Sequence, residues 1–462
     1  MFCPNTFKLI NERDNKTNFF IIRLKHKYTI TYFARMLTKS DKFIFILIFG
    51  LLLFLNFNRH AKHGSFNYHS ELWADKAGYQ VFLPALFYYD FKASEFPEDI
   101  ARQTGTGFSL DDKSNKVLTK YPIGVAIMQL PFFTIGAGVD AIIHSKEPRG
   151  YSKVQHKMIG VSTIFYAVLG LLFLFKSLPQ HSRKTRYLLL FLTVFASNLF
   201  FYITRDAGLS HGYSFFLFAL LLYTLNQFVA QPKQYAFLVV SICCIVFGSL
   251  VRPINILFYG LASAIVLVPN FKTFIEHKKE VLIGFGVAIP FVLLLVIPQL
   301  LYYNYAFGDY LAYSYNDERF LYFGNPRIAR VWFAPANGLL LYSPVFILFA
   351  VGIVMRFRKY RLQSSLTLLL FFAITYLYAS WWTPGLGCGY GHRGFIEFLP
   401  FFAIPMAHVL GKLKTNAITM FMTMIALLYI ILLVYFQYHY DGCWYGNGYW
   451  DWQELLLILG IN

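Results

Sequence analysis

Long apolar runs, separated by short polar and basic segments, dominate the chain from about residue 43 onwards. Several of these runs, such as 281–303 and 419–436, are long enough to cross the roughly 30 Å hydrocarbon layer of a bilayer. Because backbone groups at that depth must be satisfied within the chain, we expect each run to be a helix. The runs are continuously apolar rather than alternating, which argues against the strands of a transmembrane barrel.

The pattern predicts an all-α polytopic membrane protein with about eleven transmembrane helices. The predicted spans are 43–57, 157–175, 187–204, 211–229, 235–251, 254–268, 281–303, 338–355, 366–382, 394–410 and 417–437. Residues 1–42 form a basic cytoplasmic tail in which Met36 is an alternative start, and residues 438–462 form an aromatic extracytoplasmic tail. No small-residue cleavage site follows the first span, so we interpret it as retained rather than as a signal peptide.

Whether the segment 121–143 crosses the membrane decides on which side every later loop lies. The segment is apolar, but Pro122, Gly124, Pro131 and Gly136 interrupt it. If this segment does not cross the membrane and the N-terminus is inside, most of the lysines and arginines fall in the cytoplasmic connections, as the positive-inside rule requires. We therefore expect it to be a re-entrant or in-plane segment, within one large outer loop at 58–156. The predicted location is the cytoplasmic (inner) membrane, with the C-terminus outside.

Composition excludes a soluble fold, because 57% of the residues are hydrophobic and only 14% are charged. A net charge of +18 would indicate nucleic acid in a soluble protein. Here the basic residues lie in short clusters between apolar runs, so we interpret them as topology signals and expect no nucleic-acid partner. Cys388 and Cys443 both fall in predicted outer segments, where a disulfide can form.

Two acids near the start of the outer loop, Glu71 and Asp75, are the candidate catalytic residues. Asp75 lies among aromatic residues that favour the membrane surface, where its carboxylate could take a proton from an attacking hydroxyl or amine. The competing interpretation is a solvated loop acid. His60, His63 and His69 precede these acids, but their spacing matches no regular ligand set. We therefore assign no metal site, and a divalent metal stays the less favoured alternative.

The stretch 74–79 (ADKAGY), followed by 120–133 (KYPIGVAIMQLPFF), resembles the first outer loop of GT-C glycosyltransferases. The resemblance is closest to the group of protein O-mannosyltransferases and lipid A aminoarabinose transferases. Later pieces occur in matching order, namely 210–216 (SHGYSFF), 252–255 (RPIN), 338–344 (GLLLYSP), and 381–382 (WW) leading to 391–394 (GHRG). Each piece is short, so their order between about residues 43 and 437 carries the resemblance.

The resemblance implies a membrane glycosyltransferase with an inverting mechanism. It implies a polyprenyl-phosphate-linked sugar donor, an extracytoplasmic acceptor that is a protein, lipid or glycan, and a first-loop acid as base, which is Asp75 in this chain. Many relatives have two adjacent acids where this chain has Asp75 and Lys76. Their donor and metal requirements therefore do not transfer directly to this chain.

A lipid phosphate leaving group needs cations at the membrane surface. Lys120 is the first candidate, because relatives often place a phosphate-binding lysine or arginine at this point. Arg252 interrupts a long apolar stretch, where an arginine at the centre of a span costs about 2.5–3.5 kcal/mol. Arg393 and His211 lie at predicted outer helix ends, and Ser210 is suited to cap the helix that begins there. The alternatives are snorkelling or interfacial residues, and a span end at Arg252.

The predicted outer loop between residues 304 and 337 carries candidate acceptor- or sugar-binding residues, although an interfacial aromatic belt explains its tyrosines equally well. These candidates are Tyr313, Tyr315, Asp317 and Glu318. The expected partners are the donor lipid, membrane lipids and the acceptor. The rival functions are a secondary transporter, which tends to show inverted repeats that we do not find here, and a non-catalytic lipid-carrier scaffold.

Overall fold

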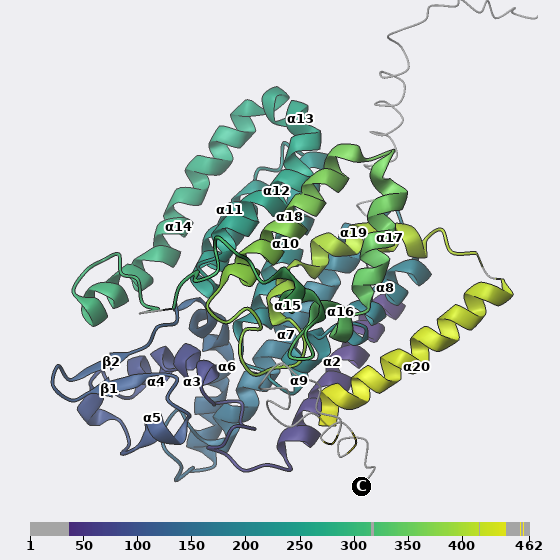
Figure 1. The fold of residues 1–462 in the computed structure, drawn as a ribbon. Coiled ribbons are helices and arrows are strands. Elements are labelled where there is room, and N and C mark those ends of the chain that lie inside the picture. The colour runs from purple at the N-terminus through teal and green to yellow at the C-terminus, as the bar shows by residue number, and fades with distance from the viewer. Residues whose placement is uncertain (1–36, 316–317, 415, 440–452, 454–455, 457–462) are drawn as a thin grey trace, which may run out of the picture.

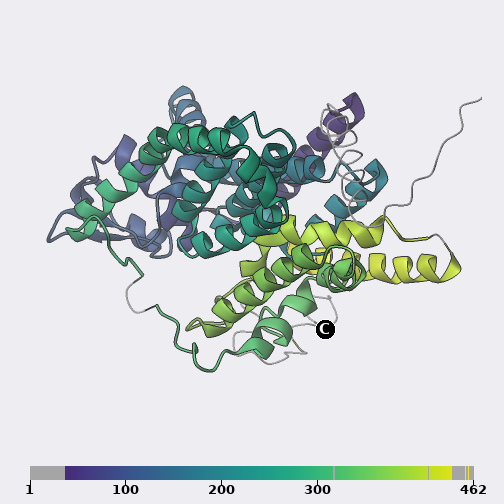
Figure 2. The same ribbon diagram turned by 90° about the horizontal axis from the view of Figure 1, so that it is seen from above.

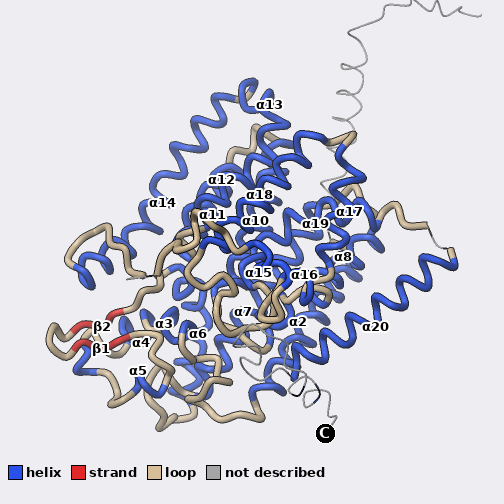
Figure 3. Tube along the Cα trace, in the orientation of Figure 1, coloured by secondary structure: helices blue, strands red, loops and turns tan. Residues whose placement is uncertain are grey.

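The structure, a computed structural model, describes residues 37–315, 318–414 and 416–439, together with 453 and 456 (Figure 1). Within these residues it is mostly helical, as the tube in Figure 3 shows. Nine helical segments of the described chain are long and apolar enough to cross a membrane. They are α2 (Lys39–His60), α6 (Gly124–Ile142), α7 (Lys153–Ser177), α10 (Ser210–Ala230), α12 to α13 (Asn255–Glu276), α14 (Lys278–Phe307), α18 (Arg361–Ser380), η3 with α19 (Arg393–Leu410) and α20 (Ala417–His439).

The polytopic, helical character predicted from the apolar runs is thus confirmed. Two shorter apolar helices, α11 (Ala236–Val251) and α17 (Val345–Phe357), accompany the long ones. Figure 1 shows α14 and α20 on opposite flanks of the described bundle, and Figure 2 shows the same arrangement from above. Both flanking helices are strongly apolar and only 11% buried over their most apolar windows, as expected for surfaces that face hydrocarbon.

Two predicted spans, 187–204 and 338–355, are each broken in the structure. The first is divided into α8 (Arg183–Phe195) and α9 (Leu199–Thr204), and the second into α16 (Leu339–Tyr342) and α17. The breaks meet each other, because the Asn198 N–H donates to Ser343 Oγ (3.3 Å) and the Val345 N–H donates to Ala196 O (3.1 Å). Backbone freed by the breaks is satisfied by the neighbouring segment, which makes irregular backbone tolerable inside a membrane protein.

Helices α2 and α7 define the two ends of the bundle. Thr38 caps α2, and near it Asp41 lies 3.5 Å from Arg183. At the other end of α2, the His60 ring lies 3.7 Å from Glu71, beside the start of α7, which Ser152 caps. The outer loop predicted from the sequence therefore gathers at one end of the bundle.

The segment between α2 and α6 folds into a small unit at that end, seen at the lower left of Figure 1. It consists of α3 (Asp75–Gln80), α4 (Phe82–Phe87), η1 (Ala93–Glu95), α5 (Ile100–Gln103), β1 (Ser109–Asp111) and β2 (Lys116–Leu118). The two strands pair antiparallel with Ser109 opposite Leu118. The Tyr302 hydroxyl of α14 accepts from the Thr119 N–H at 2.7 Å, which holds this unit against the membrane helices.

Helix α6, which covers the ambiguous segment, is continuous despite its internal Pro131. Its length would allow it to cross a membrane. Both of its ends, however, contact the side of the bundle that carries the small unit. The Ile123 N–H donates to Gln299 Oε1 at 2.7 Å, and Asp140 Oδ2 accepts from Ser152 Oγ at 2.5 Å. Helix α6 therefore lies along the first half of α7 only.

The remaining described helices complete the connections between these elements. They are α15 (Ile328–Phe333), η2 (Val268–Asn270) with α13 (Phe271–Glu276), and η3 (Arg393–Phe398) leading into α19 (Leu399–Leu410). Helix α12 itself covers Asn255–Leu267 and packs against α18. Arg252 ends α11 just before α12, and Arg393 begins η3, so both cations lie at helix junctions rather than in helix interiors.

Candidate functional site

Asp75 begins α3, and the backbone just before it is held in an unusual conformation. Ala74 has φ of 51° and ψ of −123°, a region that costs an L-residue about 1–3 kcal/mol. Gly107 permits this backbone course, because a Cβ at that position would lie 1.8 Å from the Ala74 carbonyl oxygen. The Ala74 N–H also donates to Thr104 O at 2.8 Å. Strained backbone of this kind gathers at functional sites, which directs attention to Asp75.

Two cavities meet at Asp75. The first, called here the apolar cavity, has a volume of about 500 Å³ and includes Ile254, Ile256, Leu257, Leu377 and Trp381 in its wall. The second, called here the polar cavity, has a volume of about 650 Å³ and includes Tyr68, Trp73, Lys76, Arg205 and Asp206. Asp75, Leu209, Leu386 and Arg393 line both cavities. A group at Asp75 can therefore touch molecules in either one.

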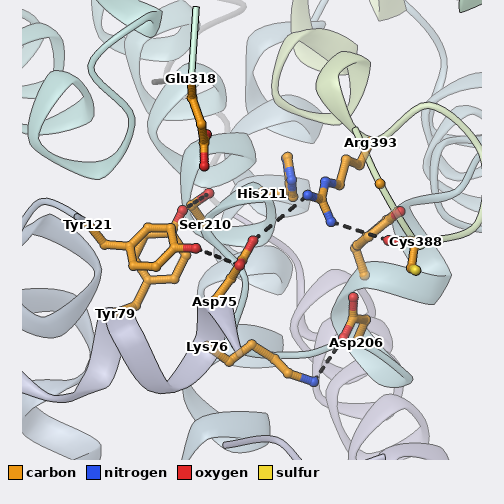
Figure 4. A network of polar contacts seen from close by, with 12 residues as sticks. Asp75, Lys76, Tyr79, Tyr121, Asp206, Ser210, His211, Glu318, Cys388 and Arg393 are labelled. Atoms are coloured by element: carbon orange, nitrogen blue, oxygen red, sulfur yellow. Dashed lines mark hydrogen bonds and ion pairs between the residues drawn. The ribbon is translucent and has the colours of Figure 1, made fainter. Parts of the chain in front are cut away.

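The Asp75 carboxylate is held from two directions (Figure 4). The Tyr121 hydroxyl donates to Asp75 Oδ1 at 2.5 Å, and Arg393 Nη2 lies 3.8 Å from Asp75 Oδ2. Burial and the adjacent carboxylate raise the pKa of Tyr121 well above its usual value, so its hydroxyl remains a donor. The Asp75 side chain is still 42% exposed. An oriented and accessible carboxylate is the arrangement that a general base requires.

The three predicted phosphate-binding cations all line the apolar cavity, so the structure brings them together. Each of them also has a carboxylate of the protein beside it. Lys120 Nζ lies 2.5 Å from Glu318 Oε1, Arg252 Nε lies 3.3 Å from Glu397 Oε1, and Arg393 lies beside Asp75. The cations are thus members of ion pairs rather than bare charges.

His211 and Ser210 contact Arg252 at the start of α10. Arg252 Nη1 lies 3.1 Å from His211 Nε2 and 3.4 Å from Ser210 Oγ, and Nη2 lies 3.3 Å from the Tyr378 hydroxyl. The predicted cap was wrong, because α10 begins at Ser210 itself and its hydroxyl makes no cap bond. Instead Ser210 Oγ accepts from the Tyr79 hydroxyl at 3.1 Å, which links α3 to α10.

Glu397 is a residue that the sequence reading missed. It is fully buried, its Oε1 lies 3.2 Å from His211 Nδ1, and its Oε2 has no hydrogen-bond partner among the described residues. A lone acid in the apolar run 394–410 is itself a signal, because a charge inside a membrane segment is kept only where it has a function or a partner.

Glu71, the second catalytic candidate, lies away from both cavities. It precedes α3 rather than sharing a helical face with Asp75, and it is buried 3.7 Å from both His60 and His156. Burial opposes its ionisation, but the contact with His156 and the nearby His60 outweigh it and lower the pKa of Glu71 to about 2. Glu71 is therefore a buried acid between two histidines, away from both cavities.

Lys76, which follows Asp75 in α3, is only 3% exposed. Its ammonium lies 2.8 Å from Asp206 Oδ1 in the wall of the polar cavity (Figure 4). Although burial opposes ionisation, this ammonium holds the pKa of Asp206 below its usual value. The pair ties α3 to the turn before α10, so it fixes the position of Asp75 relative to Ser210.

The predicted acceptor-binding residues Tyr313, Tyr315 and Glu318 line the apolar cavity, together with the cations. Asp317 lies outside the described residues. Cys388, which lines the polar cavity, is disulfide-bonded, while its predicted partner Cys443 lies outside the described residues. Within the described chain, no cluster of three or more histidine, cysteine or acidic side chains has the geometry to hold a metal ion.

Comparison of the chain with models of protein families, with curated proteins and with solved structures finds no match. What the site can do must therefore be argued from its own residues.

Proposed function

We propose that this chain is a membrane glycosyltransferase that moves a sugar from a polyprenyl-phosphate carrier to an extracytoplasmic acceptor. One observation carries the proposal. Asp75 lies at the boundary of two cavities with different walls. One has the larger apolar wall together with Lys120, Arg252 and Arg393, and the other contains Lys76, Arg205 and Asp206. A reaction between a lipid-borne molecule and a water-borne one needs such a boundary.

The apolar cavity suits the carrier. Ile256 and Leu257 line it, and they are 56% and 58% exposed on the surface of the bundle. A bilayer around the bundle would cover such residues, so a polyprenyl chain can enter from the hydrocarbon without crossing water. Lys120, Arg252 and Arg393 then meet the phosphate at the inner end of the cavity.

The polar cavity suits the acceptor. Tyr68, which is 51% exposed, and Trp73 provide aromatic faces there, and Asp206 with Lys76 provides polar groups. The acceptor's hydroxyl would approach Asp75 from this side. This assignment replaces the expectation that the segment 304–337 holds the acceptor.

The chemical step uses these groups in order. The acceptor oxygen attacks the anomeric carbon while its proton passes to Asp75, and the bond from that carbon to the phosphate oxygen breaks. The bonding pair leaves with the phosphate, whose growing negative charge faces Arg252, Arg393 and Lys120. Preorganised cations aimed at developing charge are among the largest contributors to catalysis. Attack opposite the departing phosphate inverts the configuration of the sugar.

The topology that accompanies this proposal has eleven crossing segments, with α6 confined to the outer half of the membrane. The contacts of both α6 ends with the side of the small unit support that placement. The two cavities then face away from the cytoplasm.

The test is sugar transfer by the purified protein from a synthetic polyprenyl-phosphate donor, with Asp75→Asn as the variant. Asparagine keeps the shape but cannot take up the proton as a carboxylate does, so transfer should fall by about a hundredfold or more. Asp112→Asn, an exposed acid of the same small unit that lines neither cavity, is the matched control and should behave as wild type.

Near-normal transfer by Asp75→Asn would overturn the assignment of the base. If the wild-type protein transferred no sugar but moved a solute across vesicle membranes, the transporter would replace the enzyme as the better interpretation.

A further inference from the structure

Glu318 holds Lys120 where a phosphate would be expected to bind. The two groups are 2.5 Å apart, their side chains are 26% and 34% exposed, and both line the apolar cavity. Because the phosphate and the Glu318 carboxylate are both negative and repel each other, a phosphate that binds the Lys120 ammonium in this cavity competes with Glu318 for it. Binding of an anion here is therefore an exchange of partners.

The other two carboxylates that pair with the cations of the cavity cannot make this exchange. Glu397 is fully buried behind Arg252 and His211, so it has no water to move into. Asp75 is fixed by the Tyr121 hydroxyl, and in the proposed reaction it must stay beside the acceptor. Glu318 alone among these three has a partly exposed side chain that the proposed chemistry leaves free to move.

Described residues on both sides of Glu318 hydrogen-bond to other parts of the chain, and the exchange that we consider is a rotation of the Glu318 side chain. On one side, Ser314 Oγ donates to Lys120 O at 2.7 Å. On the other side, the Trp382 N–H donates to Arg319 O at 3.0 Å. The Lys120 ammonium also lies 5.4 Å from the centre of the Tyr121 ring and 5.8 Å from that of Tyr315, within reach of cation–π attraction. These rings hold the ammonium in place while its carboxylate partner changes.

We propose, on the basis of the proposed function, that Glu318 is a displaceable counter-ion for the carrier phosphate. The phosphate takes Lys120 from Glu318 when the carrier binds, and Glu318 takes Lys120 back when the spent carrier leaves. Because the Lys120–Glu318 pair is lost when the carrier binds, the free energy of that pair lowers the affinity for the carrier. This limits product inhibition, because the polyprenyl monophosphate released by transfer carries more negative charge than the donor and would otherwise bind more tightly.

The experiment measures binding of a polyprenyl monophosphate to purified protein in detergent, with no sugar transfer required. Glu318→Gln should bind it about twofold to fivefold more tightly than wild type, the range that a partly exposed ion pair supports. Asp309→Asn is the matched control, because this exposed acid lies on the same segment, outside the apolar cavity, and removes the same charge. It should leave the affinity unchanged.

A double-mutant cycle with Lys120→Gln isolates the exchange. If Glu318 acts through Lys120, the gain from Glu318→Gln should disappear in the Lys120→Gln background. An equal gain in both backgrounds would show general charge repulsion and overturn the proposal, as would unchanged or weaker binding by Glu318→Gln. Failure of wild type to bind the monophosphate would instead overturn the carrier assignment on which the proposal rests.

Discussion

Replacing Tyr121 with phenylalanine tests whether Asp75 is positioned by its neighbours. The change removes one hydroxyl, which donates to Asp75 Oδ1 at 2.5 Å. The ring itself stays, because it packs 4.3 Å from the Tyr79 ring centroid and against Gly78, where a Cβ would lie 2.5 Å from Tyr121 Cδ2. The variant should therefore fold normally while one carboxylate oxygen of Asp75 loses its donor.

The size of the effect follows from the charge on the acceptor atom. A hydrogen bond to an ionised group contributes about 1.5–3 kcal/mol. Because about 1.4 kcal/mol corresponds to a tenfold change in rate, Tyr121→Phe should lower kcat by about tenfold to a hundredfold. The donor KM should change little, since the hydroxyl faces Asp75 and not one of the cations.

The assay is steady-state transfer, with Tyr79→Phe as the matched control. The Tyr79 ring packs against the Tyr121 ring, but its hydroxyl donates to Ser210 Oγ instead of Asp75, so removing it should cost far less in kcat. The reasoning would be refuted by an unchanged kcat in Tyr121→Phe. It would also be refuted by an equal loss in both variants, which would indicate disturbed packing rather than a lost positioning bond.

Three further predictions concern stability, topology and the acceptor. Glu71→Gln should lower stability at pH 7 by up to about 3 kcal/mol and leave transfer per folded molecule unchanged. The folded pKa of Glu71 is about 2, below its ordinary value of 4.5, so its stabilisation is present above pH 4.5 and is lost as the pH falls towards 2. The difference in melting temperature from wild type should thus shrink at pH 3. Single cysteines in a cysteine-free background should react with an impermeant reagent on intact cells at Ser109 but not at Lys184 or Lys359, and labelling at Lys359 would reverse the proposed orientation. Tyr68→Ala should raise the acceptor KM without changing the donor KM, and an altered donor KM would contradict the assignment of the two cavities.

The helical segments could be predicted from the sequence because hydropathy and capping are local properties. Apolar runs predicted the long helices, although the predicted span 157–175 began four residues after the start of α7, which Ser152 caps. The breaks at residues 196–198 and 343–344 could not be predicted in the same way. They depend on contacts between two segments about 145 residues apart, since Asn198 bonds to Ser343 across the bundle. Pro344 was a visible local signal for one of them, but Asn198 was not.

The site shows the same division between local and long-range information. Arg252 was noticed because a charge in an apolar run is anomalous, and the same argument applied to Glu397 would have found its partner. The pair of Lys120 with Glu318 joins residues 198 positions apart, and nothing near either one indicates it. In the sequence, Tyr121 stands out only as part of the segment 120–133. Its contact with Asp75 depends on the close packing of Gly78 and Gly107, which lie far from it along the chain or on another element.

Arg393 connects the two halves of the proposed reaction through its charge. It lines both cavities, and without substrate its counter-ion is Asp75, 3.8 Å away. When Asp75 takes the proton of the acceptor, the carboxylate loses its negative charge and Arg393 loses that counter-ion. At the same moment the carrier phosphate gains negative charge as its bond to the sugar breaks. The guanidinium can then stabilise the phosphate more strongly without moving, because the attraction it shared with Asp75 has ended. In this arrangement, proton removal from the acceptor directly favours departure of the carrier.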